Sequence, residues 1–308
     1  MAGAQRRFKE KIRATSTLEK VFRAMELIAA SRISKARNAA LGQDPYTQAL
    51  IKSIQMVAGD AQYTHPLVTE RTDTNKVVVF VVTSDRGMAG AYSSSVLREA
   101  DRFMDQLREQ GKEPVLYVSG RRGASYYNFR GVPVAQTWVG YSDKPSDAVS
   151  HEIATTLLDR FLAPADEGGV AELHVVYTRF ISMVTQHVHI RRMLPLQVVD
   201  APQSAESSAA DAVPETQKIT PLYEYEPSAQ AVFDALLPMY ITSRIRGIML
   251  MAAASELASR QQAMHSATEN ASELINQYTR LANNARQAEI TTEITEIISG
   301  ADALGKSS

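Results

Sequence analysis

The chain has 308 residues, with 33 lysines and arginines against 34 aspartates and glutamates, which gives a formal net charge of −1. This length allows one large domain or two ordinary ones, and the balanced charge argues against a dedicated nucleic-acid binder. The absence of cysteine excludes disulfides, thiolate metal sites and thiol catalysis. No apolar run reaches the length of about 18 residues that a membrane span needs, and the N-terminus lacks the apolar core of a signal peptide. We therefore expect a soluble, uncleaved protein.

Two terminal segments are poor in residues that break helices. Residues 3–58 contain one proline and two glycines, and residues 228–298 contain one of each. Such stretches predict helices of about 80 and about 105 Å at about 1.5 Å per residue. Helices this long need a partner along much of their surface, and we expect these two to pair with each other.

Apolar residues in the second segment recur in alternating steps of three and four, the spacing of a left-handed coiled coil. They are Met264, Ala267, Ala271, Leu274, Tyr278, Leu281, Ala285 and Ala288. A less regular stripe in the first segment comprises Leu18, Phe22, Met25, Ala29, Ile33, Ala36 and Ala40. Because the chain must return after its middle segment, the pair is predicted to be antiparallel, with Met25 opposite residues in the 260s.

The second helix is predicted to be the longer one, so its end from about Ala288 onward has no partner within the chain. This end carries isoleucines on one broad face, namely Ile290, Ile294, Ile297 and Ile298. An uncovered apolar face indicates a protein partner.

The middle of the chain alternates strands with helices. Lys76–Thr83 is a continuous apolar run rich in valine, which is typical of a strand buried on both faces. Further strands are predicted at 114–119, near 132–136, at 173–180 and at 188–199, and helices at 93–110, 120–129 and 146–162. This order predicts a Rossmann-like α/β domain inserted between the two terminal helices.

The predicted division is therefore a discontinuous coiled-coil shaft, residues 1–70 and 221–308, and a Rossmann-like domain, residues 71–220. Residues 200–221 are rich in alanine, serine, proline and acids, so we expect an exposed loop there.

Two motifs suggest phosphate binding. Residues 300–307 match the phosphate-loop pattern G-x-x-x-x-G-K-[ST], but that loop needs a strand before it and a helix after it. A helix precedes it here, so we interpret the match as a coincidence. The turn at 84–90 (SDRGMAG) has better context, between a buried strand and a helix.

The spacing of this turn is not G-x-G-x-x-G, and no following acid is placed to hold a ribose. We interpret Asp85, Arg86, Gly87 and Gly90 as a structural turn or a partner contact, and a phosphate cradle remains the alternative.

No catalytic, cofactor or metal site emerges from the remaining residues. His187 and His189 would share one strand face, but a third ligand is not close in sequence. The first 40 residues hold ten basic groups and three acidic ones, a net charge of +7. Nucleic acid is one possible partner of such a face, and solvent or acidic protein loops are the favoured ones.

Four stretches resemble the γ subunit of F-type ATP synthases. They are Met1–Ala4 with Lys20–Arg32 (KVFRAMELIAASR), Thr83–Gly90 (TSDRGMAG), Ala253–Glu256 with Met264–Ile275 (MHSATENASELI), and Ala285–Gly300. The resemblance runs nearly end to end. Phe22, Arg23, Leu27 and Ile28 vary the opening helix, and Met88 and Tyr92 vary the turn. The absence of a plastid transit segment and of the cysteine pair of plant plastid members suggests a bacterial type.

The resemblance implies a non-catalytic central rotor shaft of a proton-translocating F-type ATP synthase. Its partners would be the α and β subunits of the catalytic hexamer, the ε subunit and the membrane rotor ring of c subunits, at the cytoplasmic face of the cell membrane. Proton-driven rotation would cycle the β subunits through their states and regulate ATPase activity, and the chain itself would need no cofactor.

The resemblance also implies roles for single residues. Arg286, Gln287 and Thr291 would catch a β loop, and a cation in place of Met25 would disturb coupling. We add Ile290, Ile294 and Ile297 as contacts with an apolar collar of the hexamer. The alternatives are an adaptor coiled coil without a rotary role and a nucleotide-dependent enzyme that uses the 84–90 turn.

Overall fold

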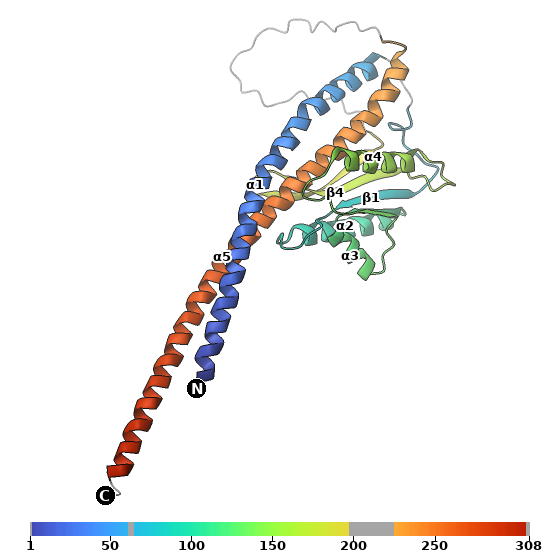
Figure 1. The fold of residues 1–308 in the computed structure, drawn as a ribbon. Coiled ribbons are helices and arrows are strands. Elements are labelled where there is room, and N and C mark those ends of the chain that lie inside the picture. Colours follow the sequence, from blue (N-terminus) through green and yellow to red (C-terminus); the bar gives the residue numbers. More distant parts are fainter. Residues whose placement is uncertain (1, 61–64, 197–224, 306–308) are drawn as a thin grey trace, which may run out of the picture. The chain divides into compact units, whose positions relative to one another are not determined.

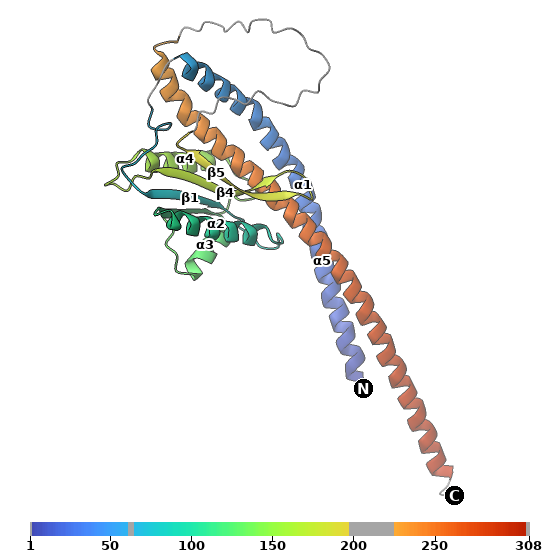
Figure 2. The ribbon, with the colours of Figure 1, turned by 180° about the vertical axis from the view of Figure 1, so that it is seen from behind.

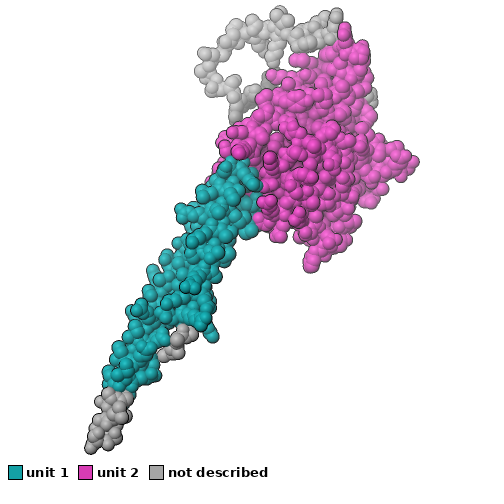
Figure 3. Space-filling view, viewed as in Figure 1, with its two compact units in different colours: residues 1–33, 88–90, 257–308 teal, residues 34–87, 91–256 magenta. Residues whose placement is uncertain are grey.

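The computed structural model describes residues 2–60, 65–196 and 225–305 (Figure 1). In chain order its elements are α1 (Ala2–Asp60), β1 (Lys76–Val82), α2 (Tyr92–Glu109), β2 (Glu113–Ser119), α3 (Arg121–Phe129), β3 (Gln136–Trp138), α4 (Asp147–Leu162), β4 (Glu172–Phe180), β5 (Gln186–Leu194) and α5 (Ala229–Gly305). The chain forms two compact units (Figure 3): unit 1 is Met1–Ile33, Met88–Gly90 and Leu257–Ser308, and unit 2 is Ser34–Gly87 and Ala91–Glu256. Both long helices contribute to both units.

Unit 2 contains one five-stranded sheet in the order β3-β2-β1-β4-β5. The first four strands are parallel, and β5 adds antiparallel to β4 at one edge. In this unit α2 and α3 cover one face of the sheet, and α4 and the first part of α5 cover the other (Figures 1 and 2). The predicted Rossmann-like α/β sheet between two terminal helices is confirmed.

The sequence of β1 follows from its position at the centre of this sheet. Val77, Val79 and Val81 pack toward α2, whereas Val78 and Phe80 pack toward α4 and α5, and all five side chains are fully buried. Since both faces are covered, the strand needs a continuous apolar run instead of an alternating one.

In unit 1 the two long helices lie side by side and run antiparallel. The ring centroids of Phe8 and Tyr278 are 6.4 Å apart, and His265 Nδ1 lies 3.0 Å from Glu26 Oε1. From Phe8 to Glu26 the residue numbers rise along α1, while those of the contacting residues fall along α5 from Tyr278 to His265, so the two helices are antiparallel. The sequence predicts that Met25 lies opposite residues in the 260s, and its neighbour Glu26 does contact His265.

The same helices also pair in unit 2. Ser243 of α5 lies between two α1 side chains, with its Oγ 2.7 Å from Thr47 Oγ1 and accepting a hydrogen bond of 2.9 Å from Gln43 Nε2. Small polar side chains at this contact allow the two backbones to approach closely.

The predicted seam of α5 is only partly correct. Met264 and Ala271 are buried, whereas Leu274 and Leu281 are 40% and 38% exposed. Ile275 is half-buried in place of Leu274, and Ala282 is buried at 6% in place of Leu281. The heptad repeat does not determine which flank faces the partner, and the helix turns its smaller residue, Ala282, toward α1.

Two further seam residues are corrected in the same way. Leu18 on α1 is 51% exposed, and Glu19 beside it is half-buried. Ala288 on α5 is exposed, and Glu289 is half-buried instead. Large apolar residues are therefore left on the outer surface of the helix pair in unit 1.

Two predicted strands differ from the structure, and one of them, β5, spans Gln186–Leu194 and not 188–199. β3 spans Gln136–Trp138 and not 132–136. Pro133 has no N–H to donate to a ladder, and Ala135 N donates to Leu116 O just before the ladder begins.

The end of α5 bears on the phosphate-loop match, because residues 300–305 are helical and not a loop. The predicted 200–221 loop lies outside the described residues.

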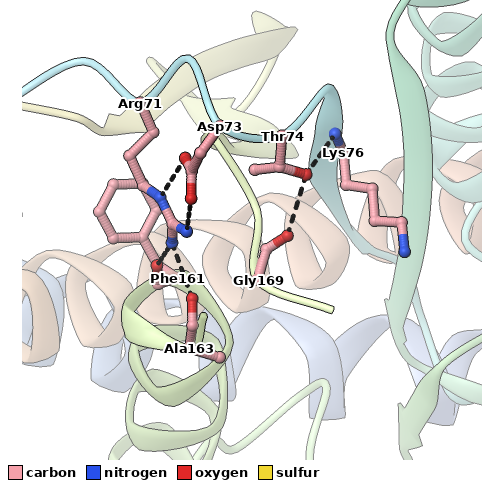
Figure 4. A network of polar contacts seen from close by, with 7 residues as sticks. All are labelled: Arg71, Asp73, Thr74, Lys76, Phe161, Ala163 and Gly169. Carbon is pink, nitrogen blue, oxygen red and sulfur yellow. Dashed lines mark hydrogen bonds and ion pairs between the residues drawn. The ribbon is translucent and has the colours of Figure 1, made fainter. Parts of the chain in front are cut away.

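Figure 4 shows how the segment before β1 is tied to α4. Arg71 Nη1 donates to the carbonyls of Phe161 and Ala163 at 2.6 and 2.9 Å, where the last turn of α4 leaves carbonyls unpaired. Asp73 holds the other edge of this guanidinium through two hydrogen bonds of 3.0 and 2.6 Å. One arginine thus caps a helix C-terminus and fixes the entry into β1.

Candidate partner-binding surfaces

In unit 1, α5 continues past the first residue of α1 (Figure 1), and its final turns carry the predicted apolar face. Ile290, Ile294 and Ile297 are 43%, 51% and 71% exposed. Steps of four and three place them on one side of the helix. The structure therefore brings these three predicted contacts together on one uncovered face.

The polar residues predicted beside them lie on the same side of α5. With about 100° of rotation per residue, Arg286, Gln287 and Thr291 fall with the isoleucines inside an arc of about 140°. Thr291 Oγ1 donates to Gln287 O at 2.9 Å, which satisfies its hydroxyl within the helix. The acids Glu289, Glu293 and Glu296 follow on the flank beyond Arg286. The face therefore combines isoleucines with two neutral polar residues and has one cation at its edge.

Met25 is not part of this face. It is half-buried on α1 beside Glu26, which contacts His265. Along α5, Ile290 lies 25 residues beyond His265, a separation of about 38 Å at about 1.5 Å per residue. Unit 1 thus contains two separate candidate surfaces, one near Met25 and one at the end of α5.

Asp85 in the 84–90 turn joins the turn to two other segments of unit 2 through hydrogen bonds. Its Oδ1 accepts from the backbone N–H of Arg121 at 3.0 Å, its Oδ2 accepts from that of Ser142 at 2.9 Å, and its own N–H donates to Ser142 Oγ at 2.9 Å. Burial raises the pKa of this carboxyl, but the N–H groups of Gly140, Ser142 and Arg121 outweigh burial and hold the pKa below its usual value.

The carboxylate of Asp85 occupies the N-terminus of α3, where an anion is stabilised by the helix dipole. A phosphate cradle at this helix end would have to displace that carboxylate. The geometry of Asp85 therefore favours the structural interpretation of the turn.

The other predicted residues of the turn are Arg86, Gly87 and Gly90. Arg86 is exposed, and a Cβ on Gly87 would meet only the guanidinium carbon of Arg122, at 3.9 Å. In unit 1, Gly90 has φ +55° and lies against α5, where a Cβ would stand 3.7 Å from that of Ala263. Gly90 thus permits a left-handed backbone beside a helix.

Replacing Asp85 with asparagine is expected to lower the free energy of unfolding by about 2 kcal/mol near neutral pH, because an amide nitrogen would face a backbone N–H. A carboxyl whose folded pKa is lowered contributes stability above its unfolded pKa and loses it as pH falls through the folded value. The wild-type advantage should therefore shrink below about pH 4, measured by urea denaturation across pH. Asp105→Asn, an exposed residue paired with Arg108, is the control, and an equal effect there would contradict this role.

His187 and His189 lie on β5 with exposed side chains, opposite Arg179 and Tyr177 on β4. In the described parts of the chain, no three histidine, aspartate or glutamate side chains gather in a way that could hold a metal ion. Likewise, none of the helices within the described ranges is both long and apolar enough to cross a membrane.

Sequence reasoning missed the contact that supports the turn. Thr83 Oγ1 donates to Ser119 O at 2.9 Å and accepts from Gly123 N at 3.0 Å. Gly120 has φ +99° and ψ 136°, and a Cβ there would collide with the backbone carbonyl of Thr83. Gly120 and Gly123 are visible in the sequence as a sign of close packing, but only the fold shows that Thr83 is the residue that lies against them.

The described chain thus combines a pair of long helices, one with an uncovered apolar face, with an α/β sheet domain. A family model described as ATP synthase matches residues 4–304. The chain is 57% identical over 307 residues to the ATP synthase gamma chain of Beutenbergia cavernae, with 100% of each covered. It is 51% identical over 306 residues to that of an Arthrobacter species, with 99% of this chain and 100% of the relative covered.

The fold is also found in a cryo-EM structure of the Euglena gracilis mitochondrial ATP synthase, OSCP/F1/c-ring, in rotational state 3. That comparison has a TM-score of 0.63 at 14% identity and covers 99% of this chain and 95% of the other. The chain belongs to the ATP synthase γ-chain family.

Proposed function

We propose that this chain is the central rotor shaft of a proton-translocating F-type ATP synthase, coupling rotation to the conformational cycle of the catalytic β subunits and regulating ATPase activity. The observation that carries the proposal is the exposed isoleucine face on a long helix in a member of the γ-chain family. ATP chemistry belongs to the β subunits, and the shaft contributes no catalytic group.

The mechanism rests on symmetry. A single rod without threefold symmetry cannot make the same contact with three identical β subunits at once. Only unequal contacts can bias identical subunits toward different conformations. To change the population ratio of two conformations of one subunit from 1:99 to 99:1, the contacts must favour one conformation by about 5.5 kcal/mol. Rotation changes which subunit receives those contacts, so an angle is converted into a nucleotide affinity.

The end of α5 suits a bearing. Ile290, Ile294 and Ile297 would run against an apolar collar of the hexamer, where few ion pairs must break at each step. Arg286, Gln287 and Thr291, on the same side of the helix, would catch a β loop. A non-directional apolar contact combined with a few polar ones allows both rotation and angle-dependent bias.

The remaining assignments follow from the same proposal. Residues 1–70 and 221–308 would act as the shaft, with their +7 N-terminal face toward acidic β loops, and residues 71–220 as the α/β domain beside the ε subunit and the c ring. The complex would hold the chain peripherally at the cytoplasmic face of the cell membrane. The 84–90 turn would serve the fold of the α/β domain.

Assembly with and without the tip tests this proposal. The full chain should co-purify as one copy for every six larger, nucleotide-binding subunits. A chain ending at Gln287 loses the isoleucine face, so we expect weaker assembly or torque, with the melting transition of unit 2 unchanged. A chain ending at Gly300 keeps that face and is the matched control.

A ratio of two chains to two partners would favour an adaptor coiled coil instead. Tight ATP or dinucleotide binding at the 84–90 turn of the isolated full chain would favour a nucleotide-dependent enzyme. Collapse of the unit 2 melting transition in the chain ending at Gln287 would contradict the layout.

A further inference from the structure

A pocket of about 240 Å³ lies within unit 2, between the β4–β5 pair and the two long helices. Arg179 and Tyr177 on β4 and His189 and Arg191 on β5 line it from the sheet. The remaining walls come from one side of each long helix, namely Ser243, Arg244, Gly247, Ile248 and Met251 of α5 and Ala40, Gln43, Asp44 and Thr47 of α1. Figure 2, the view from behind, shows that β4 and β5 extend to the two long helices.

The charges in this pocket are unbalanced. Arg179, Arg191 and Arg244 line it against a single acid, Asp44. Three positive charges and one negative charge leave +2 with His189 neutral. Like charges that line one pocket repel each other unless an anion lies between them, so an anion would balance the charge of this pocket.

Arg244 is the clearest sign of this. Among the described residues, its buried Nε atom has no hydrogen-bond partner, although a buried donor normally has one. Burial, and next the charge of Arg191, lower the pKa of its guanidinium. The group thus lies in a partly dry, positive environment with a donor left to satisfy.

His189, at the rim of the pocket, lies in the same positive electrostatic environment. Neighbouring protein atoms at the rim keep part of the water away from the His189 ring and lower its pKa, and the charges of Arg191 and Arg179 lower it further. The ring centroids of Tyr177 and His189 are 5.8 Å apart across the strand pair. Arg244 and Asp44 line the helical walls, and Asp44 is the one acid in the lining of the pocket. Neutral polar groups complete the lining, namely Gln43, Thr47 and Ser243, which are hydrogen-bonded to one another at the wall.

We propose that this pocket binds a phosphate group, either as free phosphate or as the phosphate of a nucleotide. A phosphate dianion would neutralise the charge of +2, whereas a single carboxylate would leave half of it. Planar guanidinium groups match the oxygens of phosphate in pairs. The pocket volume holds a phosphate comfortably and is too small to enclose a whole nucleotide, so the base of a nucleotide would remain outside.

Phosphate binding to the full chain tests this assignment by isothermal titration calorimetry at low ionic strength near neutral pH. We expect saturable one-to-one binding of inorganic phosphate, and chloride at matched ionic strength should give none. ADP in a separate titration distinguishes the sources, because tighter binding of ADP than of phosphate assigns the site to a nucleotide. If neither ligand binds saturably, the proposal is wrong.

Arg244→Gln should weaken phosphate binding about tenfold or more, since it removes a charged donor. Arg108→Gln is the matched control, because it removes an exposed arginine of α2 and should leave affinity unchanged. Arg244→Gln should also keep or raise the melting temperature without phosphate, as it relieves repulsion, and should abolish the rise that phosphate causes in the wild type. Equal loss of affinity in both variants would indicate non-specific attraction and overturn the assignment, and Arg191→Gln provides a second variant if Arg244→Gln fails to fold.

Discussion

Gly120→Ala is expected to destabilise the α/β unit by more than about 4 kcal/mol, the range reached only by severe backbone or core damage. Gly120 is the residue between β2 and α3, with φ +99° and ψ 136°. A Cβ there would stand 2.6 Å from Thr83 Oγ1 and would overlap the carbonyl of Thr83 still more closely. Since Thr83 follows the central strand, neither backbone can retreat without breaking the β1–β2 ladder.

The chain offers a matched control for this substitution. Gly140 has φ +95°, almost the same backbone conformation, but nothing lies within 4 Å of its Cβ position. Gly140→Ala should therefore reveal only the left-handed backbone cost, about 1 to 2 kcal/mol. Urea denaturation followed by circular dichroism of the full chain compares the two, and similar losses in both variants would show that the contact with Thr83 is unimportant.

The elements that could be predicted are those with a local physical cause. β1 is buried on both faces, so its valines had to form a continuous run, and its predicted end was one residue off. The long helices follow from the scarcity of glycine and proline. The isoleucine face follows from helical pitch alone, because Ile290, Ile294 and Ile297 lie on one helix.

What could not be predicted depends on contacts between distant residues. Leu274 and Ile275 fit a heptad seam equally well, and only the rotation of α5 against α1 decides that Leu274 faces outward. β3 has three residues, too few to show a period. The basic pocket joins Arg179 to Arg244, 65 positions apart, so no local motif could signal it.

Met25 connects the proposed mechanism to one side chain. It is half-buried on α1 in unit 1, and methionine is neutral, flexible and able to pack against changing surfaces. A lysine there would bring a charge to a partly desolvated helix surface. Glu26 is the next residue, and side chains at adjacent positions of a helix do not face each other, so the new ammonium group would lack an easy partner within the chain.

Met25→Lys is therefore expected to leave ATP hydrolysis by the assembled complex within about twofold, while ATP-driven proton pumping falls about fivefold or more. The ammonium group would pair with a carboxylate of the surrounding hexamer at some shaft angles and not at others, and about 1 to 3 kcal/mol of misplaced bias matches the usual size of coupling between sites. Both rates are measured on the same membrane vesicles. Met25→Gln, without the charge, and Ala24→Lys, with the charge on the exposed neighbouring position, should both remain coupled. Parallel loss of hydrolysis and pumping in Met25→Lys, or the same uncoupling in Ala24→Lys, would mean that position 25 has no particular part in transmitting rotation.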